Sequence, residues 1–338
     1  MRSAQVTIKD IAKSLGISPS TVSRALKDHP DISYETKEAV KKLAKELNYN
    51  PNLVALSLRH SKTYTIGVII PEIVHYFFSS VISGIEDATH DRGYNVMICQ
   101  SNELYEREVS STKALLAARV EGLLVSMSKT TIQYDHFLNL RDNKIPIVFF
   151  DRHCPIIDTD RVLLDDFEGA YKATKHLIKK GCKRIAHLFA PQHLAIGKNR
   201  LEGYLKALED NNIKPDNELI IKCDIHEKAL EIVPRLLSLP NAPDGIFAVN
   251  DNTAAGAMIA VKQKGLKVPK DVAIVGFSNS LISTVTDPPI TSVEQKGYEM
   301  GKKAAEMLIR RLDAKELYPA ETEILKSELI IRNSSQKR

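Results

Sequence analysis

The stretch GISPSTVSRALKDHP, residues 16–30, decides how the first part of the chain folds. Gly16 is suited to end one helix, and Ser18 followed by Pro19 is typical of the N-cap and first position of the next helix. The inward stripe of this second helix follows helical spacing: Val22, Ala25 and Leu26. Its first turn consists almost entirely of short hydroxyl side chains, so the question is what such a surface contacts.

Helices are expected on both sides of this stretch. Thr7 can cap a helix that starts at Ile8, with Asp10 in the capping-box position. One face of that helix is apolar: Ile8, Ile11, Ala12 and Leu15. A third helix, from about Ser33 to Asn48, is expected to bury Val40, Leu43 and Leu47. Two helices joined by a short turn that contains glycine, with a third to complete the core, describe a helix-turn-helix.

In a helix-turn-helix the second helix enters the major groove of DNA and its N-terminal residues meet the base edges. Ser20, Thr21 and Ser23 are short enough to let that helix approach, and they can hydrogen-bond phosphates or bases. Arg24 is the only long donor on the outer face, and a guanidinium can bond guanine in bidentate fashion. The alternative is local, because Ser and Thr also cap helices without any ligand.

The charge distribution supports a polyanionic partner. The formal net charge is +5, and residues 1–62 hold eleven Lys and Arg against six Asp and Glu. The remaining residues are balanced, with 36 of each sign. A basic end on a neutral body favours nucleic acid, with a solvated charged face as the alternative.

After a linker at residues 50–62, the pattern changes to alternating strands and helices, which is typical of doubly wound parallel sheets. The expected strands are 65–70, 94–99, 122–126, 146–150, 184–189, 245–249 and 272–277. The expected helices are 77–92, 103–119, 167–180, 199–211, 227–238 and 252–264. About 270 residues leave room for two such sheets, with a changeover near 151–164 and a return near 288–295. Ligands of such folds collect beyond the strand ends and between domains.

Several classes of function are disfavoured. No apolar run is long enough to span a bilayer, and residues 1–16 lack the apolar core of a signal peptide, so a cytoplasmic location is expected. The four cysteines have no metal-ligand spacing, and neither a metal nor a cofactor is expected. The chain has no HExxH, GxGxxG, P-loop or GxSxG motif, and the histidines of the body, His75, His136, His153, His187 and His193, share no ligand spacing, so the protein is not expected to be an enzyme.

With the helix-turn-helix, the linker and the alternating body in this order, the chain resembles the LacI/GalR family of bacterial transcription regulators. The resemblance runs from about Val6 to Arg332, and its most specific part is VTIKDIAKSLGISPSTVSRALKDHPDISYETKEAVKKLAKELNYNPN. Later motifs agree: IGVIIP, EGLLV, PIVFFD, RLEGY, AVND, VAIVGF and DPPITSVEQ. The implied fold is an N-terminal all-α headpiece (1–50) and a hinge helix (51–62), followed by a two-lobed α/β body like the periplasmic binding proteins (63–338). The lobes are expected at 63–163 plus 291–322 and at 164–290 plus 323–338.

The resemblance implies specific DNA contacts. Ser20 and Arg24 match positions that read bases, and four residues match positions that hold phosphates: Thr7, Ser18, Ser33 and Thr36. Pro19 stands where relatives often carry a Tyr or Thr that contacts a base, which puts base recognition there in question. In the hinge the matching residues are Asn52, Ala55 and Leu58. Leu58 is similar to the leucine that wedges into the central base step; Leu56 is a competing wedge, and packing against the body is the alternative.

The resemblance also implies an effector cleft between the lobes. Its matching residues are Tyr76, Phe77, Ser128, Asp151, Arg152, Arg200, Asn250 and Asp251. Arg200 looks like the arginine that grips a carboxylate or sugar hydroxyls in relatives. Ser278 occupies a position where many sugar-responsive relatives carry Asp, and Leu194 replaces a polar residue of the purine-responsive branch, which argues against a purine. For Tyr76 and Phe77 the alternative is that they are core aromatics.

The sequence is compatible with three candidate functions to different degrees. The first is a homodimeric regulator, with a tetramer left open, that binds a double-stranded operator and is controlled by a small molecule related to carbohydrates. The second is a soluble binding protein of the periplasmic type, for which the headpiece would have no role. The third is an enzyme, for which no motif speaks. Sequence alone leaves open the effector's identity, its direction of control and the genes concerned.

Overall fold

A computed structural model describes residues 6–49, 62–314, 316 and 318–337. The chain divides into two compact units, residues 1–64 and 65–338. The hinge residues Asn52, Ala55 and Leu58, together with Leu56, lie outside the described residues.

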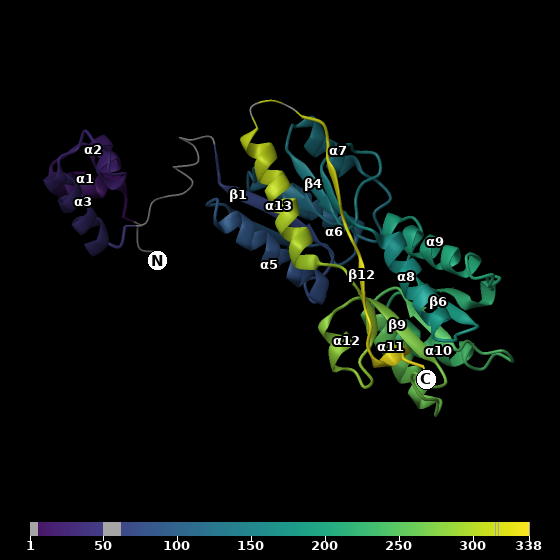
Figure 1. Cartoon of the computed structure of the whole chain (residues 1–338). Coiled ribbons are helices and arrows are strands. Elements are labelled where there is room, and N and C mark those ends of the chain that lie inside the picture. Colours follow the sequence, from purple (N-terminus) through teal and green to yellow (C-terminus); the bar gives the residue numbers. More distant parts are fainter. Residues whose placement is uncertain (1–5, 50–61, 315, 317, 338) are drawn as a thin grey trace. The chain divides into compact units, whose positions relative to one another are not determined.

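The first unit is a three-helix headpiece made of α1 (Ile8–Leu15), α2 (Pro19–Leu26) and α3 (Tyr34–Glu46) (Figure 1). Gly16 ends α1 in the left-handed conformation, at φ 64°. The core of the headpiece is small and fully apolar: Ile11, Ala12, Val22, Ala25, Val40 and Ala44. The expected helices are confirmed, with one correction. Leu47 is 36% exposed, and Ala44 takes the inward position on α3.

The second unit is a body with two six-stranded sheets, each forming the centre of one lobe (Figure 1). In the first lobe the strand order is β11-β5-β4-β3-β1-β2 and all neighbours are parallel. These strands are β1 (Thr65–Ile70), β2 (Asn95–Gln100), β3 (Gly122–Val125), β4 (Ile147–Phe150), β5 (Arg161–Leu164) and β11 (Thr322–Leu325). The helices of this lobe are α5 (Tyr76–His90), α6 (Tyr105–Ala117), α7 (Asp135–Asp142) and α13 (Gly297–Asp313).

The sheet of the second lobe has the order β12-β10-β9-β8-β6-β7, with only β12 antiparallel to its neighbour. Its strands are β6 (Ile185–Phe189), β7 (Ile220–Lys222), β8 (Gly245–Ala248), β9 (Ala273–Ser278), β10 (Thr291–Glu294) and β12 (Glu328–Ile330). Its helices are α8 (Asp166–Lys179), α9 (Ala195–Glu209), α10 (His226–Leu236), α11 (Asp251–Gln263) and α12 (Leu281–Val285), with short 3₁₀ turns at Asn217–Leu219 and Asn333–Ser335. The pairs α8/α9 and α10/α11 pack with this sheet in separate apolar clusters.

The chain crosses between the lobes at residue 165, at residues 295–296 and at residues 326–327, within the described part of the body. Two expected lobe boundaries are therefore corrected. Strand β10, at 291–294, belongs to the second sheet, and β11, at 322–325, belongs to the first. The parallel topology sends the carboxyl ends of the central strands of both sheets toward the crossings, where polar loops from both lobes meet.

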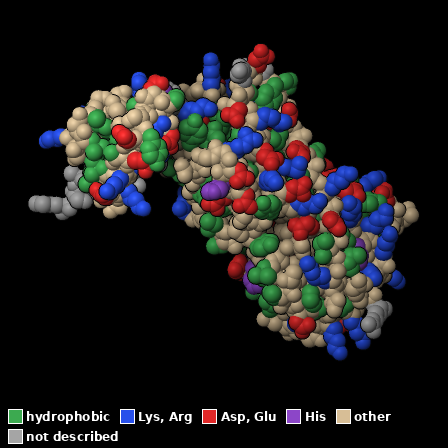
Figure 2. All heavy atoms as spheres, turned by 60° about the vertical axis from the view of Figure 1, so that its left-hand side comes forward, with side chains coloured by type: hydrophobic (Ala, Val, Ile, Leu, Met, Phe, Trp, Pro, Cys, Tyr) green, Lys and Arg blue, Asp and Glu red, His purple; other side chains and the backbone are tan. Residues whose placement is uncertain are grey.

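The surface of the body carries interspersed charges of both signs (Figure 2). This mixture agrees with the equal numbers of acidic and basic residues after residue 62. Among the helices of the described ranges, none combines the length and apolarity required to cross a bilayer.

Candidate functional site

The outward face of α2 is open in the headpiece. Ser18, Pro19, Ser20 and Arg24 are exposed. Thr21 is half-buried, and its amide donates to the Ser18 hydroxyl at 3.0 Å. Ser23 is also half-buried. The inward stripe of α2 anchors this face, since Val22 and Ala25 are fully buried. A short-sided helix with one long exposed cation suits entry into the major groove.

The residues expected to hold phosphates all lie at helix N-termini. Ser18 caps α2, and Ser33 caps α3 by accepting the Thr36 amide at 3.3 Å. Thr7 caps α1, where its amide and hydroxyl both donate to the Asp10 carboxylate. Thr7, Ser18 and Ser33 therefore have a structural role as helix caps within the headpiece. Because helix N-termini present free N–H groups and a positive dipole end, the same positions are also suited to anions.

The body holds a cleft of about 690 Å³ lined from both lobes. Eight of the expected effector residues line it: Tyr76, Phe77, Asp151, Arg152, Arg200, Asn250, Asp251 and Ser278. Tyr76 is 53% exposed and Phe77 is buried, so the first is an open aromatic face and the second is part of the wall. Leu194 is buried and contributes an apolar wall with no hydrogen-bonding group.

Arg200 is held rigidly at the base of the cleft. Its Nε donates to Asp166 Oδ1 at 2.7 Å and its Nη1 donates to the Val249 carbonyl at 2.7 Å. Its guanidinium carbon lies 3.6 Å from the centre of the Phe277 ring. Nη2 lies 2.7 Å from the same Asp166 oxygen, yet it forms no well-directed hydrogen bond among the described residues. One buried N–H group of this arginine is therefore left without a well-directed hydrogen bond among the described residues.

Arg152 and Asp151 follow β4 on the other side of the cleft. Arg152 Nη1 donates to Glu103 at 2.7 Å and to the Met127 carbonyl at 3.1 Å. Burial raises the pKa of Asp151 to about 6, against the opposing effect of the nearby Arg152 charge. Asp151 also adopts a φ of 59°, in the left-handed region that non-glycine residues seldom enter. Such backbone strain is concentrated at functional sites.

Asn250 and Asp251, at the start of α11, both form hydrogen bonds that stabilise the fold of the second lobe. The Asn250 side chain accepts the Thr253 amide at 2.8 Å and donates to the Asp224 carbonyl at 2.9 Å. Both carboxylate oxygens of Asp251 are engaged inside the lobe, by Ser292 and by the amide and hydroxyl of Ser280. Burial raises the pKa of Asp251 to about 6.

Ser128 does not line the cleft, which corrects its expected place there. It is fully buried, and its amide and hydroxyl both bond to the Glu108 carboxylate, at 2.6 and 2.9 Å. Glu108 also accepts from Thr131 and bonds to His136. Ser128 thus helps to fix the loop that carries Lys129 into the cleft.

Sequence reasoning missed several polar residues of the cleft: Glu103, Lys129, Asp224, His75 and Gln295. Lys129 Nζ lies 2.9 Å from Asp224 Oδ2, and this ion pair joins the two lobes. Four of the five lie within four residues after a strand, so the rule that ligands collect at strand ends could have found them.

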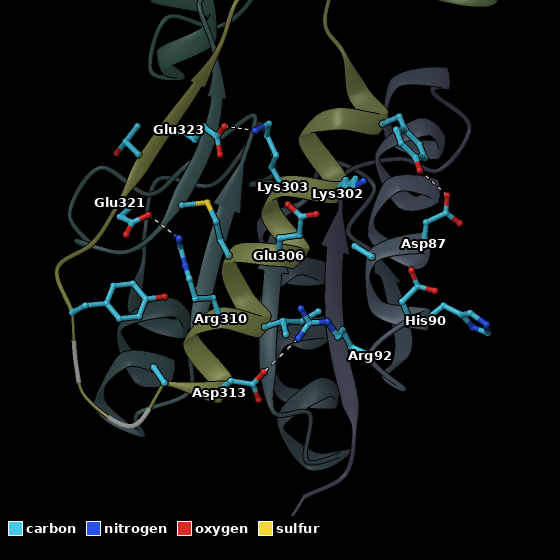
Figure 3. Close-up of a pocket in the computed structure, with 18 residues that line it drawn as sticks. Asp87, His90, Arg92, Lys302, Lys303, Glu306, Arg310, Asp313, Glu321 and Glu323 are labelled. Atoms are coloured by element: carbon cyan, nitrogen blue, oxygen red, sulfur yellow. Dashed lines mark hydrogen bonds and ion pairs between the residues drawn. The ribbon is translucent and has the colours of Figure 1, made fainter.

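A larger hollow, of about 1400 Å³, lies between α5, α13 and the segment that leads into β11 (Figure 3). Its charged side chains largely pair with one another across the hollow, as in Arg310–Glu321, Lys303–Glu323 and Arg92–Asp313 (Figure 3). The smaller cleft is the better binding site, because it combines buried polar groups, a free buried donor and strained backbone.

Comparisons with known proteins agree with this division of the chain. Residues 7–52 match the family model for bacterial regulatory proteins of the lacI family, and residues 174–335 match a periplasmic binding protein-like domain. The chain is 32% identical to the HTH-type transcriptional repressor PurR of Vibrio vulnificus, over 98% of this chain and 99% of that protein. It is 34% identical to the ribose operon repressor of Halalkalibacterium halodurans, over 98% and 97%.

Solved structures show the same architecture. A complex of the transcriptional regulator CelR with cellobiose is 26% identical, covers 98% of this chain and 100% of that one, and superposes with a TM-score of 0.74. The Lac repressor dimer bound to operator and the anti-inducer ONPF, at 24% identity, 98% and 99% coverage and a TM-score of 0.87, shows the shared fold. The chain therefore belongs to the LacI family of bacterial regulatory proteins, and it is a DNA-binding transcriptional regulator.

Proposed function

We propose that the protein is a homodimeric repressor whose hold on a pseudo-palindromic operator is set by a small, carbohydrate-like molecule bound between the lobes of the body. The observation that carries the proposal is the pairing, in one chain, of an open recognition helix with a lined cleft between two lobes. A ligand that binds one closure state of the lobes better than another shifts the population of that state. Operator affinity then changes through the coupling between the two sites.

The recognition surface of the headpiece supports Ser20 and Arg24 as base-reading residues. Both are exposed on the face of α2 opposite its buried stripe. Thr7, Ser18, Ser33 and Thr36 are the proposed phosphate positions, together with Thr21 and Ser23 on the flank of α2. Pro19 at the start of α2 offers only apolar contact there. In the hinge, Asn52, Ala55 and Leu58 complete the proposed DNA contacts.

The chemistry of the cleft supports a polyhydroxylated effector. Carboxylates, arginines and amides offer donors and acceptors on several sides, and Tyr76 offers an exposed ring on which an apolar sugar face can stack. Two similar proteins are named for ribose and cellobiose. The apolar Leu194 gives no polar partner to the ring edge of a purine.

We propose no catalytic role for the cleft and place the protein in the cytoplasm, where a regulator of transcription meets DNA. Among the described residues, no group of three or more His, Cys, Asp or Glu side chains is positioned to hold a metal ion. The polar residues that line the cleft offer hydrogen-bond donors and acceptors to a bound molecule.

The first test is operator binding by the full-length protein, with promoter fragments in gel-shift titrations at two salt concentrations. Contact with about 6–10 phosphates would make affinity fall steeply between them. Arg24→Met is expected to weaken specific binding by about 1–3 kcal/mol and to relax selectivity at one base pair. Lys42→Met, an equal loss of charge on the exposed face of α3, is the control and should preserve base selectivity. Failure to bind any duplex at either salt concentration would refute the proposed function.

A further inference from the structure

Each fixed cation on the wall of the cleft already has a carboxylate partner from the protein itself. Arg200 is paired with Asp166, Arg152 with Glu103 and Lys129 with Asp224, at 2.7, 2.7 and 2.9 Å. The carboxylates on the wall also outnumber the cations two to one: Glu72, Glu103, Asp151, Asp224, Glu227 and Asp251 against Lys129, Arg152 and Arg200. The cleft is therefore electrically negative, although it contains two arginines.

Because these ion pairs are buried, the zero net charge of each pair strongly affects which ligands can approach. The side chains of Arg200 and Asp166 are each only 4% exposed, so water screens their charges little. A carboxylate or phosphate that approached Arg200 would meet Asp166 directly behind it and would have to compete for a guanidinium that is already paired. Removal of one partner of a buried pair, by contrast, leaves an uncompensated charge that strongly favours a counterion.

The same arginines still have N–H groups to offer. Nη2 of Arg200 lies 2.7 Å from Asp166 Oδ1, and Nε of Arg152 lies 3.6 Å from Asp151 Oδ2. Both nitrogens are buried, and neither makes a well-directed hydrogen bond among the described residues. An unpaired buried donor is unfavourable, and a ligand oxygen relieves that cost. A hydroxyl can accept such a hydrogen bond without bringing a charge into a negative cleft.

We propose that Asp166 is a specificity-determining residue, which makes Arg200 a neutralised donor so that the cleft takes an uncharged, hydroxyl-bearing effector and rejects anionic analogues such as sugar phosphates and sugar acids. This inference rests on the proposed function in one respect, that the cleft is the effector site. Asp166 does not itself line the cleft; it acts through Arg200 and is a positioning residue.

The test is a change of charge selectivity in the full-length protein. Asp166→Asn keeps the shape of the side chain and leaves Arg200 without its counter-charge. Titration calorimetry with inorganic phosphate and with glucose 6-phosphate, at constant ionic strength, should show affinity higher than that of the wild type by on the order of tenfold or more. Adding Arg200→Met to Asp166→Asn should abolish the gain, since the guanidinium is the group that binds the anion.

Asp165→Asn is the matched control. Asp165 is the N-cap of α8 and accepts the Glu168 amide at 3.0 Å, and Asn caps helices equally well. The control removes the same charge one residue away without changing the partner of Arg200, and it should leave anion affinity at the wild-type value.

A second variant keeps the test valid should Asp166→Asn fold poorly. Glu103→Gln removes the nearer of the two carboxylates beside Arg152, since Asp151 Oδ2 remains 3.6 Å from Arg152 Nε, and it should raise affinity for phosphate by a smaller factor than Asp166→Asn does; Glu106→Gln on the exposed face of α6 is its control. The inference is overturned if wild-type protein binds either anion at micromolar concentration, if neither variant gains affinity, or if the gain survives removal of the arginine. None of these readouts involves DNA, so their failure is distinguishable from failure of the proposed function.

Discussion

Ser18 shows that one side chain of the headpiece can have a structural role and a proposed binding role together. Its hydroxyl accepts the Thr21 amide at 3.0 Å and lies 2.9 Å from the Thr21 hydroxyl, so it completes the first turn of α2. It is nevertheless exposed, at a helix end that favours anions. Stability and DNA affinity can therefore be separated at this residue by a change of charge.

Ser18→Asp is expected to separate them. Asp is as good an N-cap as Ser, and a negative charge at a helix N-terminus is worth about 0.3–1 kcal/mol, so the headpiece should be as stable as the wild type or more stable. The same charge repels phosphate, so operator affinity should fall. Ser18→Asn, a neutral cap, should keep both properties. Circular dichroism melting and gel shifts provide the two measurements, and unchanged operator affinity for Ser18→Asp would show that no phosphate lies near residue 18.

Asp151 makes the stability of the body depend on pH. Burial raises its pKa from 3.8 to about 6 in the folded protein, with smaller increases from Asp166 and Glu103 and opposing effects of Arg152 and Arg200. Between about pH 4 and pH 6 the folded state binds more protons at this site than the unfolded chain. The contribution of Asp151 to the free energy of unfolding therefore falls as pH rises through this window and stays low above it.

Asp151→Asn removes that titration. Relative to wild type, the variant should gain on the order of 2–3 kcal/mol in free energy of unfolding when the pH is raised from about 4 to about 7.5. Urea unfolding of the two proteins at both pH values measures the difference. Asp158→Asn, at an exposed carboxylate, is the control and should show no such gain. An equal difference between variant and wild type at both pH values would contradict the raised pKa of Asp151 in the folded protein.

At the scale of elements, the sequence predicted most clearly those strands of the body that are continuous apolar runs. The seven expected strands of the body match β1, β2, β3, β4, β6, β8 and β9 to within a residue or two. Five further strands went unpredicted, and each has only three or four residues: β5, β7, β10, β11 and β12. Length alone does not explain the difference, because β3, β4 and β8 also have four residues and were predicted; these three are fully buried apolar runs, whereas each missed strand includes partly or fully exposed positions. They become strands because they hydrogen-bond to neighbouring strands of the sheet, and the sequence alone does not show that pairing.

Helix α13 was also missed, although it has 17 residues. Its N-cap, Lys296, has φ 52° and makes no side-chain capping bond, so the usual start signal is absent. The effector positions were accessible through family resemblance and strand ends. The lobe-bridging contacts of Lys129 were not, because they depend on where two sheets meet in space.

The packing of α5 against α13 depends on two glycines. A Cβ atom on Gly84 would lie 2.1 Å from the Tyr298 carbonyl oxygen, and one on Gly301 would lie 2.0 Å from the Val81 carbonyl oxygen. Both obstacles are backbone atoms, which cannot move aside by a rotamer change. The two helices therefore approach each other more closely than side chains would allow.

Gly84→Ala and Gly301→Ala are each expected to destabilise the body, although alanine is the better helix former by about 1 kcal/mol. Overpacking of this kind costs about 1–3 kcal/mol or more, because the helices must separate. Ser83→Ala, on the exposed side of α5, is the matched control and should be neutral or slightly stabilising. Thermal unfolding compares the three variants. A melting temperature raised by either glycine substitution would mean that the helices are further apart.

At the scale of the whole body, closure of the cleft rests on a few polar contacts from lobe to lobe. Lys129 supplies two of them, since its Nζ pairs with Asp224 and its carbonyl oxygen lies 2.6 Å from His193 Nε2. Asn252 adds a third by donating to His75 Nδ1 at 3.3 Å. Because these contacts are few, the closed state is favoured only slightly over the open state. A ligand can therefore shift the equilibrium between the two states, as a ligand-controlled switch requires.

Breaking the Lys129–Asp224 pair should shift the body toward open lobes. The Lys129 side chain is 26% exposed and that of Asp224 8%, so the pair is partly screened and is worth about 1 kcal/mol, roughly a fivefold change in the ratio of closed to open molecules. Spin labels at Glu106→Cys and Lys198→Cys, on exposed faces of α6 and α9, report the distance between the lobes. Lys129→Met and Asp224→Asn should each broaden that distance distribution toward longer values, and effector affinity should fall by the same factor, because binding must then close the lobes. Lys206→Met breaks an ion pair within α9 alone and should leave the distribution unchanged.

The reversed pair, Lys129→Asp with Asp224→Lys, should restore closure. If the reversed pair stays as open as the single variants, attraction between these two charges is not what holds the lobes together, and the hydrogen bonds of His193 and Asn252 must carry closure instead.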